Sequence, residues 1–195
     1  NGAKVKDSDK VMETVTDLKP DTEYKLSVKR NSDRSDETAF STDYEYVTLN
    51  VRDFHAFGDG VHDDTAAVQA AILSCPEFGR GEIPEGIYSV TSLFLKSKIT
   101  IDIAKNAVLT GTKDRKALPI LPGMIQSYDE KEDYNLGTWE GNPISCFSSL
   151  ITGIHVSDVI ITGEGTLDGN AAEEDWWTED RSKFEAARPR MIFLN

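Results

Sequence analysis

The sequence predicts an all-β fold, built mainly as a solenoid of short stacked strands with one helix near its start. From residue 82 onward, short apolar runs are separated by Gly, Asn, Asp or Ser. Part of this pattern recurs further along the chain. A helical sequence pattern occurs before these runs but not between them. A doubly wound sheet would need a helix between successive strands. Together these observations favour stacked coils over a layered α/β sheet.

The internal repeat predicts which strands stack. Residues 97–101 read SKITI and residues 157–161 read SDVII, while VLTG at 108–111 matches TLDG at 166–169. Each copy is a strand, a turn and a second strand, as expected of neighbouring coils. Because side chains alternate along a strand, we expect Ile99 and Ile101 to point inward and Thr100 to point outward.

A helix is predicted from Thr65 to Cys75. Its sequence is rich in Ala and Leu, and Val68, Ile72 and Cys75 fall on one helical face. Asp63 or Asp64 can cap its first turn, and Pro76 ends it. We interpret the acidic pair as capping, since it lacks the spacing of a calcium loop.

The first fifty residues form a different pattern. Tyr24, Leu26 and Val28 alternate with polar residues, as in a strand with one buried face, and a further strand is expected at 39–49. Leu18-x-Pro20-x-Thr22-x-Tyr24 resembles the E–F corner of fibronectin type III modules, in which the tyrosine hydroxyl reaches nearby backbone. The resemblance implies that residues 1–49 are the C-terminal part of such a β-sandwich and that a second domain covers 50–195.

Composition limits the possible partners. The formal net charge is −13, which disfavours nucleic acid, and no apolar run approaches the roughly 20 residues of a membrane span. The three histidines are isolated, so no metal or other cofactor is expected. Cys75 and Cys146 lack metal-site spacing, and whether they pair is left open.

A long stretch at 112–149 separates the two copies of the repeat. It carries Tyr128, Tyr134 and Trp139. Loops of this length in a compact domain are usually functional or disordered. The aromatic residues are interpreted either as a platform for sugar rings or as anchors that hold the loop on the coils.

Residues 53–72, DFHAFGDGVHDDTAAVQAAI, resemble the entry segment of pectate-lyase-like right-handed parallel β-helix proteins. In these proteins a helix covers the open N-terminal end of the coils. A solenoid end exposes apolar surface and unpaired strand edges, so it needs such a cap.

Further motifs narrow the resemblance to family 28 glycoside hydrolases, the polygalacturonases. Residues 160–170, IITGEGTLDGN, resemble a family rung, followed by Trp176-Trp177 and by RPRMI at 188–192. TWEG at 138–141 is similar to an element of exo-acting bacterial members, although Thr138 stands where an arginine is expected. The resemblance implies a secreted or periplasmic enzyme that hydrolyses α-1,4 bonds of polygalacturonate or oligogalacturonides with inversion.

The resemblance also guides the choice of site residues. The family's catalytic motifs lie downstream of the RPRMI-like segment, so we expect no catalytic residue in this chain and no turnover by it. Asp168, which precedes a glycine at the end of a strand, is interpreted as a turn residue. The expected substrate-binding residues are Trp139, Glu140, Trp176, Arg188 and Arg190. Arginine side chains match the geometry of carboxylates. However, Arg181, Lys183 and the other cations of this segment alternate with acidic residues, so a solvated surface is the competing interpretation. For Trp176, the competing interpretation is that it only fills the wall of the coils.

Two other functions are compatible with the sequence. One is a pectate lyase relative, which would use calcium for β-elimination. The other is a non-catalytic β-helix adhesin that binds carbohydrate.

Overall fold

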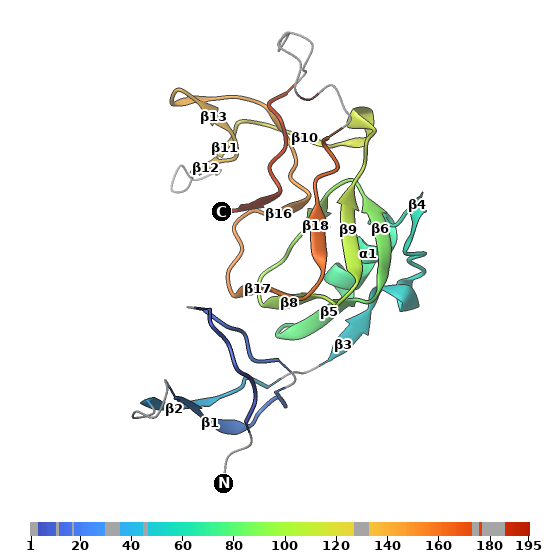
Figure 1. Cartoon of the computed structure of the whole chain (residues 1–195). Coiled ribbons are helices and arrows are strands. Elements are labelled where there is room, and N and C mark those ends of the chain that lie inside the picture. The colour runs from blue at the N-terminus through green and yellow to red at the C-terminus, as the bar shows by residue number, and fades with distance from the viewer. Residues whose placement is uncertain are drawn as a thin grey trace. The chain divides into compact units, whose positions relative to one another are not determined.

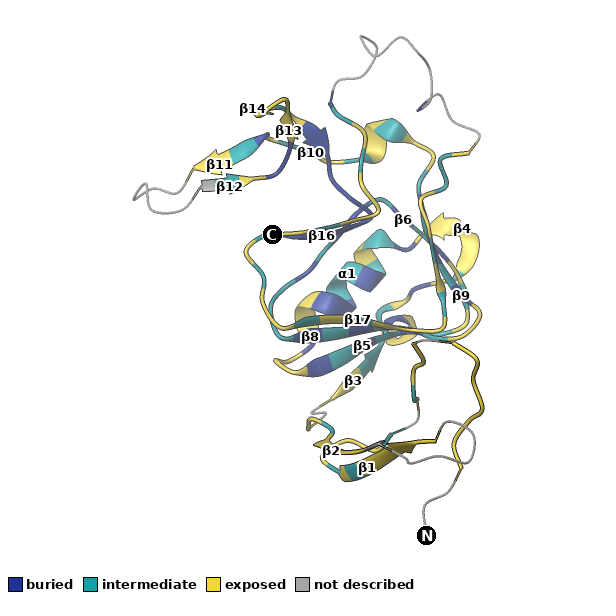
Figure 2. Cartoon of the chain, turned by 60° about the vertical axis from the view of Figure 1, so that its left-hand side comes forward, coloured by how far each residue is buried: buried dark blue, intermediate teal, exposed yellow. Residues whose placement is uncertain are grey.

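The computed structural model describes residues 4–10, 12–16, 18–29, 36–44, 47–126, 133–172, 176 and 186–195. Contacts within the chain define two compact units, Asn1–Glu45 and Tyr46–Asn195. Each unit is described by itself. The second unit contains the stacked coils and is seen from two directions in Figures 1 and 2.

The described part of the first unit contains one antiparallel strand pair. β1 (Glu23–Val28) pairs with β2 (Asp36–Ser41), which places Tyr24 opposite Phe40. The two rings stack with their centroids 5.8 Å apart. The Tyr24 hydroxyl accepts a hydrogen bond from the Lys19 main-chain N–H at 2.8 Å. The hydroxyl therefore reaches nearby backbone, while the assignment of this unit to a fibronectin type III module stays a prediction.

Two expectations for the first fifty residues are wrong. The strand predicted at 39–49 is interrupted: β2 ends at Ser41, and β3 (Thr48–Asn50) belongs to the second unit. Thr42 turns the chain after β2, because its hydroxyl donates to the Lys19 carbonyl at 2.6 Å. The expected buried face is exposed, with Leu26 at 36% and Val28 at 64%, because the described sheet of this unit has only two strands and no second layer.

The second unit winds as a parallel β-helix. In the described part of the chain, its coils contribute strands to three sheets, in the orders β3-β5-β8-β17, β4-β6-β9-β18 and β7-β16-β19, and every neighbouring pair is parallel. The bounds of these strands are β4 Asp59–Asp63, β5 Gly79–Ile83, β6 Gly86–Val90, β7 Leu93–Phe94, β8 Ile99–Ile103, β9 Ala107–Gly111, β16 Ile151–Gly153, β17 Val159–Gly163, β18 Thr166–Asp168 and β19 Ile192–Leu194.

The register predicted from the internal repeat is confirmed. Ile99 lies opposite Val159 and Ile101 opposite Ile161. In the neighbouring sheet, Leu109 lies opposite Leu167. The repeat therefore marks equivalent positions of successive coils.

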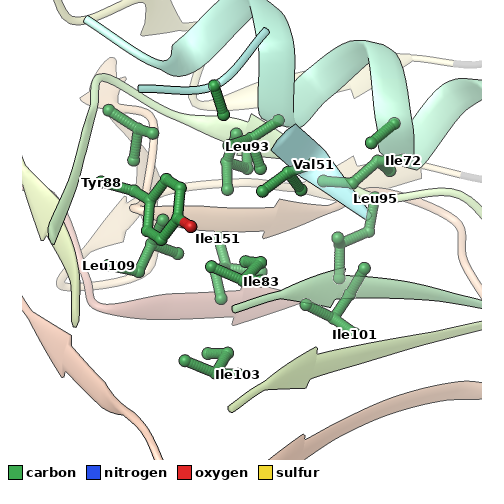
Figure 3. Close-up of a cluster of buried hydrophobic side chains, with 14 of the residues drawn as sticks. Val51, Ile72, Ile83, Tyr88, Leu93, Leu95, Ile101, Ile103, Leu109 and Ile151 are labelled. Carbon is green, nitrogen blue, oxygen red and sulfur yellow. The ribbon is translucent and has the colours of Figure 1, made fainter. Parts of the chain in front are cut away.

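Side chains alternate between the inside and the outside of the coils. In β8, Ile99, Ile101 and Ile103 are buried, whereas Thr100 and Asp102 are partly exposed. Figure 3 shows the buried side chains gathered between the strands and α1. Burying an Ile side chain contributes roughly 1.5–3 kcal/mol, so the inward ladder is the main source of stability. On the outside, the Arg80 guanidinium pairs with the Asp102 carboxylate at 2.6 Å.

β3 and β4 form the first edges of two of the three sheets. At the third, the helix α1 (Thr65–Ser74) contributes Gln69, whose side-chain amide donates to the Phe94 carbonyl and accepts from the Phe94 N–H, both at 2.8 Å. As predicted, Val68, Ile72 and Cys75 are buried. Figure 2 shows buried segments of α1, β5 and β8 close together.

The acidic pair before α1 serves the backbone. Asp63 accepts a hydrogen bond from the Thr65 N–H at 2.9 Å, at the start of the helix. Asp64 is buried and makes no side-chain capping bond; instead its carboxylate accepts from the N–H groups of Phe57 at 2.6 Å and Gly58 at 3.0 Å. Asp64 thus fixes the loop before β4.

Candidate functional site

A structured insertion separates β9 from β16. It contains the 3₁₀ turn η2 (Arg115–Ala117) and the short strands β10 Ile120–Leu121, β11 Met124–Gln126, β12 Asp133–Asn135, β13 Thr138–Trp139, β14 Asn142–Pro143 and β15 Cys146–Phe147. They form three antiparallel pairs, β10 with β15, β11 with β12 and β13 with β14. The stretch at 112–149, predicted to be a long loop, is therefore organised by strand pairs too short to give a periodic sequence pattern.

The insertion is joined to the segment that leads into β19. The Phe147 N–H donates to the Ala187 carbonyl at 2.9 Å, and the Ala187 N–H donates to the Ser145 carbonyl at 2.9 Å. These bonds place Arg188 and Arg190, which follow directly in the chain, beside the insertion.

A cavity of about 350 Å³ lies where these segments meet the coils. Its lining includes three of the predicted substrate-binding residues, Trp176, Arg188 and Arg190. The hydroxyl-bearing Thr112 and Ser148 contribute polar surface, and among the residues that the structure describes none of the lining is acidic. The two arginines thus give this lining a local positive charge in a chain whose net charge is −13.

Trp176 is a packed wall of the cavity. Only 6% of the residue is exposed. The Phe147 ring meets its ring edge-to-face with centroids 5.5 Å apart, and the Arg115 guanidinium lies 4.5 Å from its ring centroid. Trp176 therefore shapes the cavity instead of offering an open ring face.

The two arginines of the lining are each held by a main-chain carbonyl. Arg188 donates from Nη1 to the Trp176 carbonyl at 3.2 Å, and Arg190 donates from Nη1 to the Leu136 carbonyl at 3.0 Å. Arg190 also lies over the Phe193 ring, 5.1 Å from its centroid. A guanidinium carries five N–H donors, so each group can hold several partners at once. These contacts orient both groups before any ligand binds.

The buried hydroxyls beside the cavity are satisfied. Ser92 and Ser148 share a hydrogen bond at 2.6 Å, and the Ser92 hydroxyl also lies 2.5 Å from the Ser149 carbonyl. Thr152 donates to the same carbonyl at 3.1 Å. This network fixes the corner where the chain enters β7 and β16.

The other two predicted residues lie elsewhere. Trp139 and Glu140 are at the tip of the β13–β14 hairpin and are not part of the cavity lining. Trp139 is 58% exposed, so its ring can meet a ligand. Glu140 and Gly141 have φ of 49° and 84°, which form the tight turn. Trp177, Arg181, Lys183 and Tyr128 lie outside the described residues.

Sequence reasoning missed two contacts at this end of the unit. One is Arg115 against Trp176. The other joins the Tyr134 hydroxyl to Nδ1 of His155 at 2.7 Å. Both connect the insertion to distant segments, and no local motif signals either contact.

Both cysteines are buried and free. Burial raises the pKa of the Cys75 thiol and of the Cys146 thiol, although Lys96 and Arg190 respectively act in the opposite direction. We expect neither thiol to react with Ellman's reagent at pH 8 in the folded chain and both to react in urea. Rapid reaction of either thiol without urea would contradict their burial.

Because folding raises the pKa of both thiols, the free energy of unfolding should fall as the pH rises through and beyond the ordinary thiol pKa.

Neither a metal site nor a membrane span is found in the described part of the chain. No group of three or more His, Cys, Asp or Glu side chains could hold an ion there. None of the helices there is long and apolar enough to cross a bilayer.

Comparison with known proteins finds similarity to polygalacturonases. No protein-family model matches the chain. It is 29% identical over 181 residues to a probable polygalacturonase of Vitis vinifera, covering 87% of the chain and 35% of the relative. It is 25% identical over 173 residues to an exo-poly-alpha-D-galacturonosidase of Dickeya chrysanthemi, covering 80% and 26%.

A solved polygalacturonase structure is also similar to this chain. The Family 28 exopolygalacturonase of Yersinia enterocolitica aligns with a TM-score of 0.63 at 30% identity, over 80% of this chain and 28% of that one. The chain thus spans about a quarter to a third of the length of these relatives. The predicted fold class is confirmed: the chain forms coils of a right-handed parallel β-helix, similar in structure to the Yersinia enterocolitica exopolygalacturonase.

Proposed function

We propose that this chain belongs to a secreted or periplasmic glycoside hydrolase that degrades pectin. The enzyme would hydrolyse α-1,4-galacturonosidic bonds of polygalacturonate, with inversion and in the exo mode. Similarity to two named polygalacturonases and to a solved exopolygalacturonase supports the reaction class. The catalytic carboxylates are expected outside this sequence, so the chain contributes substrate binding and no turnover.

The observation that carries the proposal is the cavity bordered by Arg188 and Arg190. Arginine matches the planar, bidentate geometry of a carboxylate. A cavity of about 350 Å³ falls within the range of small-ligand sites, which is roughly 300–1,000 Å³. A uronate therefore fits both the charge and the size of the site. The exposed Trp139 ring with Glu140 would contact a second part of the oligosaccharide.

The first unit is proposed to be the C-terminal part of a fibronectin type III module. The Tyr24–Lys19 hydrogen bond supports this assignment. In the whole enzyme the module would act as a spacer or as a wall of the substrate cleft.

Calorimetric titration of the chain with galacturonate trimer tests the proposal. Arg188→Met and Arg190→Met are each expected to weaken binding roughly tenfold or more, because each removes a hydrogen bond to a charged group. Lys105→Met is the matched control, since it removes the same charge at an exposed position outside the cavity lining. A galactose trimer, which lacks the carboxylates, should bind weakly. Equal affinities for both trimers, or arginine variants that bind like the control, would refute the assignment of the cavity.

A further inference from the structure

A third arginine contacts the cavity wall from the side of the insertion. Arg115 lies on η2, and its guanidinium carbon is 4.5 Å from the centroid of the Trp176 ring. Asp114 fixes the start of this turn, because its carboxylate accepts from the Lys116 N–H at 3.0 Å. Arg115 is not in the cavity lining, and Trp176 is a lining residue that it contacts.

Trp176 connects Arg115 to a residue that can meet the ligand directly. Its ring contacts both the Arg115 guanidinium and the Phe147 ring. Its main-chain carbonyl accepts the hydrogen bond from Arg188 at 3.2 Å. A shift of the Trp176 ring would therefore change the shape of the cavity, and a shift of its backbone would change the orientation of the Arg188 guanidinium.

We propose that Arg115 is a positioning residue that sets the affinity and the charge selectivity of this cavity for a uronate. Its cation–π contact holds Trp176 in place. Through Trp176 it also steadies Arg188, the guanidinium that would meet the uronate carboxylate. The inference rests on the proposed function, because it takes the cavity to be the uronate site.

The test compares three variants of the full chain. Arg115→Met keeps the length of the side chain but removes its charge. Arg115→Lys restores the charge without the planar group. Lys116→Met is the matched control, since it removes the same charge from the same turn at an exposed position. Binding of galacturonate trimer and galactose trimer is measured at 10 °C, well below unfolding, and the melting temperature of each variant is recorded.

Arg115→Met should weaken binding of galacturonate trimer about five- to thirtyfold, the range expected for loss of a partly buried cation–π contact. The preference for galacturonate trimer over galactose trimer should fall with it, and Arg115→Lys should recover part of both. A purely structural role would lower the melting temperature and leave this preference unchanged.

Tryptophan fluorescence gives a second readout. In a Trp139→Phe/Trp177→Phe background, Trp176 is the sole tryptophan of the chain. Its emission should shift in Arg115→Met and remain unchanged in Lys116→Met. An unchanged emission in Arg115→Met would show that the contact does not hold the ring and would overturn the inference.

The two levels of the proposal fail differently. If the unsubstituted chain shows no preference for galacturonate trimer, the proposed function fails and this inference fails with it. If that preference is present but Arg115→Met retains the affinity and the preference of Lys116→Met, only the role of Arg115 is refuted.

Discussion

Replacing Gly163 with alanine is expected to lower the free energy of unfolding by about 2–5 kcal/mol, the combined cost of overpacking and backbone strain. Gly163 ends β17, lies opposite Ile103 of β8 and has a φ of 111°. A Cβ atom there would lie 2.0 Å from the Ile103 carbonyl oxygen and 2.7 Å from Oδ1 of Asp102. The carbonyl belongs to a packed strand, so the clash cannot be relieved by a side-chain rotation.

Gly81→Ala is the control for this experiment. Gly81 lies in the same sheet, opposite Ile101, and an added Cβ would be 3.6 Å from the nearest atom, Cδ1 of Ile101. Alanine is expected to be neutral or to stabilise by up to about 1 kcal/mol, because glycine loses more conformational freedom on folding. Urea unfolding followed by circular dichroism measures both variants. Equal midpoints for the two variants would contradict the described approach of β17 to β8.

Gln69→Met is expected to destabilise the second unit by about 2–4 kcal/mol, because it leaves the N–H and the carbonyl of Phe94 without their partner. In a parallel strand, alternate residues bond to opposite neighbours. The Leu93 N–H donates to the Leu150 carbonyl, just before β16, and the Leu95 N–H donates to the Thr152 carbonyl in β16. The N–H and the carbonyl of Phe94 therefore point to the free edge of the sheet. The Gln69 amide replaces a neighbouring strand at that one residue.

Gln126→Met is the matched control for the cap. Gln126 is exposed on β11, so the same substitution should change stability by no more than about 0.5 kcal/mol. Thermal unfolding of both variants, with hydrogen exchange of the Phe94 amide, separates the two cases. Slow exchange at Phe94 in Gln69→Met would show that some other group protects this edge.

The sequence predicted the parts of the fold that repeat. The match between 97–101 and 157–161 predicted the pairing of Ile99 with Val159, because equivalent positions of successive coils bury equivalent side chains. The helix was predictable from its own periodicity, because Val68 and Ile72 fall on one helical face and that face packs against the core. The bond between Gln69 and Phe94 could not be predicted, because it depends on the approach of two elements that are distant in sequence.

The site was predictable only in part. Trp176, Arg188 and Arg190 were singled out from the sequence and line one cavity, although the buried position of Trp176 follows from Phe147 and Arg115 of the insertion. Trp139 and Glu140 lie on a separate hairpin whose position depends on ladders of two or three residues. The predicted strand at 39–49 failed because Thr42 bonds back to Lys19, a contact across 23 residues that no local propensity reveals.

The most direct test of the account is to map where galacturonate trimer binds, by backbone amide NMR of the unsubstituted chain. We predict that the largest shifts fall on residues that line the cavity, namely Thr112, Ser148, Gly169, Arg188, Arg190 and Met191. Smaller shifts are expected at the Trp139 hairpin, and none on the outer face of β5 and β8. Shifts concentrated on that outer face, or spread evenly over the surface with no change at the cavity, would contradict a uronate site built from these arginines.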